Sequence, residues 1–209
     1  MALLDLLAAE RRALADLLES LTPQQWRVRT LCPAWDVHGM AAHLVVPTEF
    51  STAEMLTEMV RARGNPDRLS VAMAATRARR SSADLVEALR TGARSTKAPP
   101  VVGLVGPYTD ALVHGEDLRI PLGVADERPA QRWQPALDFL MTPRARIGFL
   151  SAARPALTYA ATDSTWTGGA GPRVEAPAAA LALALLGRTA RLDELVGPGS
   201  AVLRAHATR

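Results

Sequence analysis

The amino-acid sequence predicts a mainly α-helical protein, α+β overall, with an antiparallel four-helix bundle followed by a small C-terminal α+β domain. Apolar residues make up 48% of the chain and aromatic residues only 4%, and alanine and leucine, both strong helix formers, supply most of the apolar content. After about Arg144, strand-like runs and glycine-rich turns replace the helical spacing. We therefore predict two domains, residues 1–143 and residues 144–209.

Four long segments of the first domain have helical periodicity, and turn or capping residues separate them. In the first segment, leucines recur at intervals of three, four and seven residues, which is the spacing of an amphipathic helix. Asp36 is a suitable N-cap for the second segment, and Gly106-Pro107 opens the fourth. We predict these helices over residues 3–21, 37–63, 69–94 and 108–119.

The remaining elements are shorter. A fifth helix is expected over residues 130–140, where apolar residues share one side. The second domain should contain a hairpin of two strands joined by a glycine-rich turn, then a buried helix closed by Gly187, then a last strand. We predict these elements at residues 156–162, 173–175, 178–186 and 201–205, with the turn at 163–171.

Composition limits the cellular setting. The single cysteine, Cys32, excludes an intrachain disulfide and fits a reducing compartment. The first residues lack the basic segment of a signal peptide. The longest strongly apolar run, residues 178–186, is far shorter than the ~20 residues that a membrane-spanning helix needs. We therefore expect a soluble, cytoplasmic protein with no membrane partner.

Three side chains of the bundle could bind one divalent metal ion. Asp110 and His114 are four residues apart on a predicted helix, so they share one face. His43, two turns inside the second helix, could supply a third ligand to the same point. His38 lies on a different face from His43 and is not counted. The hypothesis is a metal site formed by His43, Asp110 and His114, with an open coordination position for chemistry.

Structural alternatives exist for each of these residues. A lone histidine on an apolar face is often a core residue that bonds a backbone carbonyl, and an Asp-x-x-x-His pair can be an exposed helix pair. In favour of the site, zinc accepts histidine nitrogen and carboxylate oxygen, and catalytic zinc sites use three protein ligands. Asp117 could orient a ligand from behind or pair with Arg119, and the residues alone leave both open.

Residues 31–44, LCPAWDVHGMAAHL, resemble the helix-2 motif of the mycothiol-dependent maleylpyruvate isomerase-like family, within the DinB-like superfamily. Residues 110–118 are similar to a later family segment, in which a carboxylate precedes the next histidine ligand by four residues. Residues 163–188 resemble the family's C-terminal domain, which is similar to sterol carrier proteins. The resemblance implies a DinB-like antiparallel four-helix bundle over 1–143 and a sterol-carrier-like α+β domain over 144–209.

The resemblance also implies an activity. A divalent metal, most simply zinc and otherwise nickel, would bind the low-molecular-weight thiol mycothiol as co-substrate. The thiolate would then attack a small electrophilic substrate, giving isomerisation or thiol transfer. Two departures from the family pattern stand out. Asp110 replaces the usual glutamate, which leaves metal identity and affinity open, and Ala34 replaces a glycine. No general acid or base is assigned, and Cys32 is expected to be a packing residue.

The sequence also suggests two other functions. A non-catalytic protein of the same fold could bind a metal or an apolar ligand. Nucleic-acid binding would rest on the net charge of +3 and on Arg77, Arg79 and Arg80, but no aromatic residues interleave with these arginines to form a stacking surface. We therefore expect small-molecule partners and no nucleic acid, and the sequence leaves the oligomeric state open.

Overall fold

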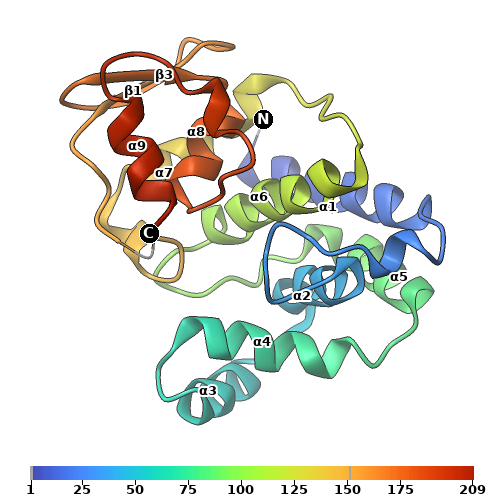
Figure 1. Ribbon diagram of the computed structural model, residues 1–209. Coiled ribbons are helices and arrows are strands. Elements are labelled where there is room, and N and C mark those ends of the chain that lie inside the picture. The colour runs from blue at the N-terminus through green and yellow to red at the C-terminus, as the bar shows by residue number, and fades with distance from the viewer. Residues whose placement is uncertain (1, 151) are drawn as a thin grey trace. The chain divides into compact units, whose positions relative to one another are not determined.

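The computed structural model describes residues 2–150 and 152–209 (Figure 1). The chain divides into two compact units, Met1–Asp126 and Glu127–Arg209. It is mainly helical with one small three-stranded sheet, which confirms the predicted fold class at this level. Within the described ranges, no helix has both the length and the apolar character needed to cross a membrane.

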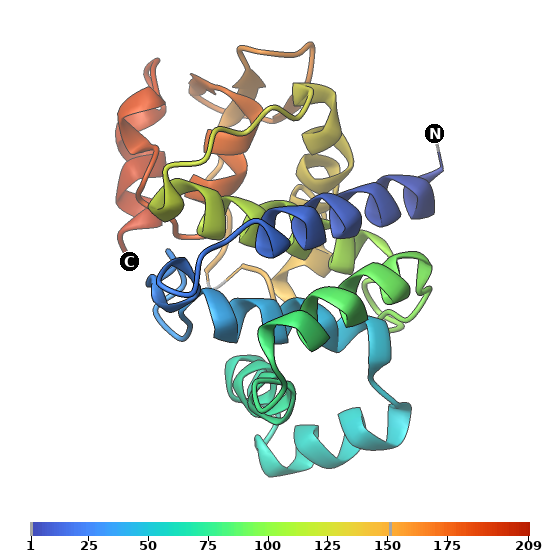
Figure 2. The ribbon, with the colours of Figure 1, turned by 90° about the vertical axis from the view of Figure 1, so that its right-hand side faces the viewer.

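The N-terminal unit is helical. Helices α1 and α2 each contact both α5 and α6, so these four helices form a closed ring of neighbours (Figures 1 and 2). Helix α4 packs on α2, and α3 packs on α4. The helices span α1 (Leu3–Glu19), α2 (Val37–Glu49), α3 (Thr52–Arg61), α4 (Pro66–Arg77), α5 (Ser82–Thr91) and α6 (Val105–Leu122), with short 3₁₀ turns η1 (Gln25–Arg27) and η2 (Gly92–Arg94).

The single helix predicted over residues 37–63 is wrong, because the structure has two helices there. Helix α2 ends at Glu49, and Phe50 has extended ψ (146°). Ser51 then caps the next helix: its hydroxyl accepts a hydrogen bond from the amide of Glu54 at 3.0 Å. A serine N-cap satisfies an otherwise unpaired amide of the first turn, so it favours a new start over continuation.

The helix predicted over residues 69–94 is also two helices, α4 and α5. Ser81 and Asp84 form a capping box at the start of α5, in which each side chain accepts a hydrogen bond from the other residue's amide. The helix predicted over residues 108–119 is present but longer, from Val105 to Leu122. It stops at Gly123, whose positive φ of 67° is the left-handed conformation that glycine adopts readily.

The C-terminal unit packs helices around a small sheet. The strand order is β2-β1-β3, with β1 antiparallel to β2 and parallel to β3. Helix α8 is buried along its whole length and contacts α7, α9 and β1. The elements span η3 (Ala130–Trp133), α7 (Gln134–Leu140), η4 (Pro143–Arg146), β1 (Thr158–Ala161), β2 (Thr167–Gly169), β3 (Arg173–Ala176), α8 (Ala178–Leu185), η5 (Leu192–Glu194) and α9 (Ser200–Ala207).

Two predictions for this unit are wrong. The hairpin partner of β1 is β2, which lies inside the predicted turn, whereas residues 173–175 belong to β3 and run parallel to β1. Residues 201–205 are part of helix α9, not a strand, because Leu203, His206 and Ala207 follow a helical spacing and are all buried. The helix expected over residues 130–140 is present as η3 and α7.

The division between the units lies earlier in the chain than the predicted boundary after residue 143. Elements η3 and α7 pack against α8, so the structure groups them with the C-terminal unit. Sequence periodicity identified the helix at 130–140 but carried no information about its packing partner.

Candidate metal centre

Helices α2 and α6 bring the three predicted ligands together. The imidazole rings of His43 and His114 lie edge to face, with centroids 4.9 Å apart and an interplanar angle of 90°. Nε2 of His114 lies 4.0 Å from Oδ1 of Asp110. One ligand atom from each of the three residues lies within 4.8 Å of the others. The cluster therefore consists of two imidazoles and one carboxylate directed at a common point.

Local helix geometry explains this convergence. Asp110 and His114 are separated by four residues on α6, so they stack on one face of the helix. Helix α2 is N-capped as predicted: the carboxylate of Asp36 accepts a hydrogen bond from the amide of Gly39 at 2.8 Å. Both histidines are buried, whereas the side chain of Asp110 is 33% exposed. The cluster thus opens to solvent at its carboxylate.

Asp117 contacts Nδ1 of His114, whereas Nε2 is the nitrogen of that ring nearest Asp110. It is completely buried, and its Oδ2 lies 2.8 Å from Nδ1 of His114. An ionised carboxylate can only accept, so the imidazole donates from Nδ1, and a neutral ring with its proton there has its lone pair on Nε2. That nitrogen is the one 4.0 Å from Asp110. A carboxylate behind a histidine is the arrangement that orients metal ligands in many proteins.

This donor set fits a divalent metal ion. Two imidazoles and one carboxylate form a ligand combination that catalytic zinc sites use, leaving a further position for water or substrate. Donor atoms that bind one zinc ion at about 2.0–2.2 Å lie at most about 4 Å apart. A cluster whose donors lie within 4.8 Å of one another therefore needs only a small contraction to hold such an ion.

The other two histidines have structural partners. Nε2 of His38 lies 3.0 Å from the carbonyl oxygen of Ala78, and its ring packs edge to face with Trp26. In the C-terminal unit, Nε2 of His206 lies 3.2 Å from the carbonyl oxygen of Leu185. His38 is thus not one of the clustered residues, as the sequence predicted.

Trp35 is a residue of the site whose position the sequence analysis did not anticipate. Its indole stacks on the imidazole of His43, with centroids 4.4 Å apart and an angle of 19°. It also presents an edge contact to His114 at 6.1 Å. Trp35 precedes the N-cap Asp36 and so lies outside the helical spacing of α2, which is why periodicity did not indicate this contact.

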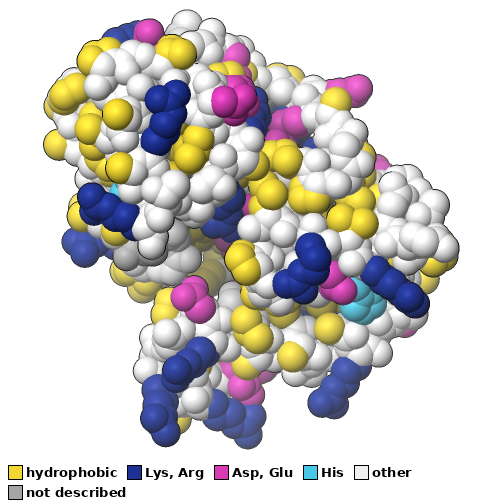
Figure 3. Space-filling model, in the orientation of Figure 1, with side chains coloured by type: hydrophobic (Ala, Val, Ile, Leu, Met, Phe, Trp, Pro, Cys, Tyr) yellow, Lys and Arg dark blue, Asp and Glu magenta, His cyan; other side chains and the backbone are white. Residues whose placement is uncertain are grey.

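The arginines that suggested a basic surface are largely paired. Nη2 of Arg77 donates to Glu54 at 3.0 Å, and Arg80 donates to both carboxylate oxygens of Glu49, at 2.7 and 2.9 Å. On the face shown in Figure 3, acidic side chains accompany the basic ones. These ion pairs leave this part of the surface with mixed charge.

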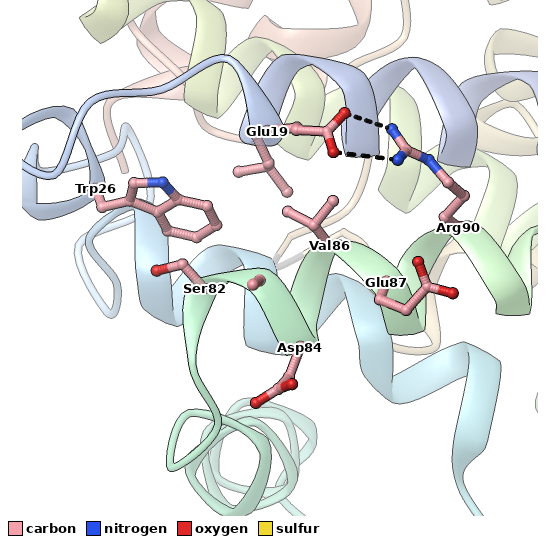
Figure 4. Close-up of a pocket in the computed structure, with 9 residues that line it drawn as sticks. Glu19, Trp26, Ser82, Asp84, Val86, Glu87 and Arg90 are labelled. Atoms are coloured by element: carbon pink, nitrogen blue, oxygen red, sulfur yellow. Dashed lines mark hydrogen bonds and ion pairs between the residues drawn. The ribbon is translucent and has the colours of Figure 1, made fainter.

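A separate pocket of about 490 Å³ lies between α1 and α5 (Figure 4). Its wall includes Trp26, Glu19 and Arg90, and the last two form an ion pair at 3.0 Å. Asp84, at another edge, accepts hydrogen bonds from Ser81. Because none of the three clustered ligands lines it, this pocket is distinct from the candidate metal centre.

Comparison with protein families identifies the N-terminal region. Residues 7–100 match the family model described as the mycothiol maleylpyruvate isomerase N-terminal domain. The match includes Trp35 and His43 and ends before Asp110 and His114. No curated protein and no solved structure matches the chain. This match confirms, for residues 7–100, the predicted resemblance to the mycothiol maleylpyruvate isomerase-like family.

Proposed function

We propose that this protein binds a divalent metal ion through His43, Asp110 and His114 and is an enzyme that uses a low-molecular-weight thiol. The family indicates mycothiol as the thiol, and the reaction would be isomerisation of a small electrophilic substrate or transfer of the thiol to it. The observation that supports this proposal is the convergence of two imidazoles and a carboxylate in a chain of this family. Zinc is the first candidate and nickel the second.

A bound divalent metal would stabilise a thiolate relative to a thiol and so supply a nucleophile near neutral pH. The residues of the chain have separable roles in this scheme. His43 and His114 bind from the buried side, and the partly exposed Asp110 marks the side from which thiol and substrate enter. Asp117 holds the proton of His114 on Nδ1, which leaves Nε2 available as a ligand atom.

The proposal extends to the two units. We propose that α1, α2, α5 and α6 form the DinB-like antiparallel four-helix bundle, since each contacts two others of the set. The α+β C-terminal unit, with its buried helix α8, would be the counterpart of the family's sterol-carrier-like domain. Metal sites in bundles commonly use side chains from facing helices, as α2 and α6 do for this cluster.

The first test is metal content. Elemental analysis of the purified protein, and titration of the metal-free protein with zinc and nickel, should give one equivalent of metal per chain. His114→Ala should bind none and keep its far-ultraviolet circular dichroism. His38→Ala is the matched control, because His38 hydrogen-bonds to the carbonyl oxygen of Ala78, just after α4, and lies outside the cluster. A wild-type protein that neither carries nor takes up metal would reject the proposal.

The second test concerns the thiol. Mycothiol should raise the Tm of the metal-loaded protein and leave that of the metal-free protein and of His114→Ala unchanged, because a ligand stabilises only a state that it binds. Stoichiometric metal without any response to mycothiol would favour the alternative of a non-catalytic metal-binding protein.

A further inference from the structure

We infer that Trp35 is a positioning residue of the metal centre, which fixes the imidazole plane of His43, and that Gly39 provides the space for it. This inference rests on the proposed function. The indole of Trp35 lies nearly parallel to the His43 ring, 4.4 Å away and at 19°, and nearly perpendicular to the His114 ring, at 82°. Trp35 thus touches one proposed ligand face to face and the other by an edge, without offering a ligand atom of its own.

The backbone of Trp35 is fixed by the chain reversal that precedes α2. Its carbonyl oxygen accepts two hydrogen bonds from Thr30, one from the amide at 3.3 Å and one from the hydroxyl at 2.9 Å. Its amide donates to the carbonyl of Cys32 at 3.2 Å, and the amide of Val37 donates to Val28 at 3.0 Å. The point from which the indole projects is therefore held by contacts that do not involve the indole.

Gly39 lies directly under the indole. A Cβ atom at this position would be 2.8 Å from Cδ1, 3.1 Å from Cβ and 3.2 Å from Cγ of Trp35. These atoms include the base of the side chain, which cannot move away while the backbone is held. Alanine is about 1 kcal/mol more favourable than glycine inside a helix, so helix formation is not the reason for a glycine here. The missing side chain admits the indole against α2.

The consequence is a restraint on His43. A flat indole packed against an imidazole resists rotation of that ring about its own side-chain bonds, since rotation would drive the ring edge into the indole. The restraint keeps a nitrogen of His43 within 4.8 Å of the ligand atoms of Asp110 and His114. Preorganisation of this kind is expected to raise metal affinity, as supporting residues around metal sites commonly do.

Two variants test the inference in the full-length protein. Gly39→Ala displaces the indole without changing any ligand, and Trp35→Leu removes it. Both should weaken zinc binding by about tenfold or more in a chelator-competition titration, and Trp35→Phe should fall between Trp35→Leu and wild type. The matched control is Trp26→Leu, because Trp26 packs against the non-ligand His38. Its zinc affinity should stay within about twofold of wild type.

A second measurement needs no metal. In proton NMR of the metal-free protein, ring current from the stacked indole should shift the imidazole protons of His43 upfield, and Gly39→Ala should reverse that shift. Reversal together with weakened zinc binding supports the inference. Wild-type zinc affinity in both Gly39→Ala and Trp35→Leu would overturn the inference and leave the proposed function intact. Weakened zinc binding with an unchanged chemical shift of His43 would have the same consequence. A wild-type chain that binds no metal would overturn both.

Discussion

Leu31 and Asp117 are joined through their backbones: the amide of Leu31 donates a hydrogen bond to the carbonyl oxygen of Asp117 at 3.1 Å. Leu31 belongs to the chain reversal that carries Trp35, and the carboxylate of Asp117 binds Nδ1 of His114. Residue 117 therefore connects the segment that covers His43 with the helix that supplies His114. These contacts link His43 and His114 in addition to the packing of α2 against α6.

The first prediction concerns the side chain of Asp117. Asp117→Asn should lower zinc affinity by about 10- to 100-fold, because an amide can donate to Nδ1 of His114 and so favour the tautomer with its proton on Nε2. The backbone bond to Leu31 does not depend on the carboxylate, so the fold should persist. Chelator-competition titration gives the affinity. The exposed Asp67→Asn is the control, and equal zinc affinity in Asp117→Asn and wild type would contradict the role given to this carboxylate.

The second prediction concerns Asp110, the proposed ligand that departs from the family pattern. Asp110→Ala should weaken zinc binding by more than about tenfold, whereas Asp110→Glu should retain one equivalent of metal. The longer side chain can still reach Nε2 of His114, which lies 4.0 Å from Oδ1 of Asp110. Titrations of both variants with zinc and nickel would also show whether carboxylate length alters the preference between these metals. Wild-type affinity in Asp110→Ala would remove this residue from the site.

Local sequence patterns were sufficient to predict helix α1 and the placement of Asp110 and His114 on one face of α6. The ligand pair Asp110 and His114 follows from a four-residue spacing on one helix, and α1 follows from its leucine spacing. The helix breaks at Ser51 and Ser81 were missed because hydrophobic periodicity continues across them, whereas a cap depends on one side-chain hydrogen bond. Caps can be read from sequence only when their residue pattern is examined directly.

The other misses depend on contacts between distant residues. Strand β3 lies parallel to β1 because of a pairing across the sheet, and no property of residues 173–176 by themselves fixes that direction. Likewise, the stack of Trp35 on His43 needs the space left by Gly39, and helical spacing does not indicate that contact. Such relationships are fixed by tertiary packing, which a reading of local periodicity does not include.

The third prediction concerns the packing of α2 against the end of α5. A Cβ atom at Gly92 would lie 2.5 Å from Cβ of the buried Thr48. Gly92 has φ −77° and ψ 3°, which other residues adopt, so the cost of a side chain there is steric. Gly92→Ala should destabilise the protein by about 1–3 kcal/mol in urea unfolding. The neighbouring exposed Thr91→Ala should cost much less, and equal stability of the two variants would argue against this close contact.

The fourth prediction is a pH dependence set by Glu54 and Arg77. The guanidinium of Arg77 is buried and donates to Glu54, which lowers the pKa of that carboxyl from its ordinary value of 4.5. The unfolded chain therefore binds more protons than the folded one in this acidic range, so the stabilisation is complete above the ordinary pKa and is lost as pH falls through the lowered one.

Glu54→Gln removes this titration while keeping the shape of the side chain. The variant should be less stable than wild type near neutral pH, and the difference should shrink as pH falls below about 4.5. Urea unfolding at a series of pH values from about 7 to about 3 measures it. Glu58→Gln is the control, because Glu58 pairs with the highly exposed Arg61 and such pairs contribute little. If the stability gap between wild type and Glu54→Gln were the same at every pH, the ion pair with Arg77 would not be the source of the stabilisation.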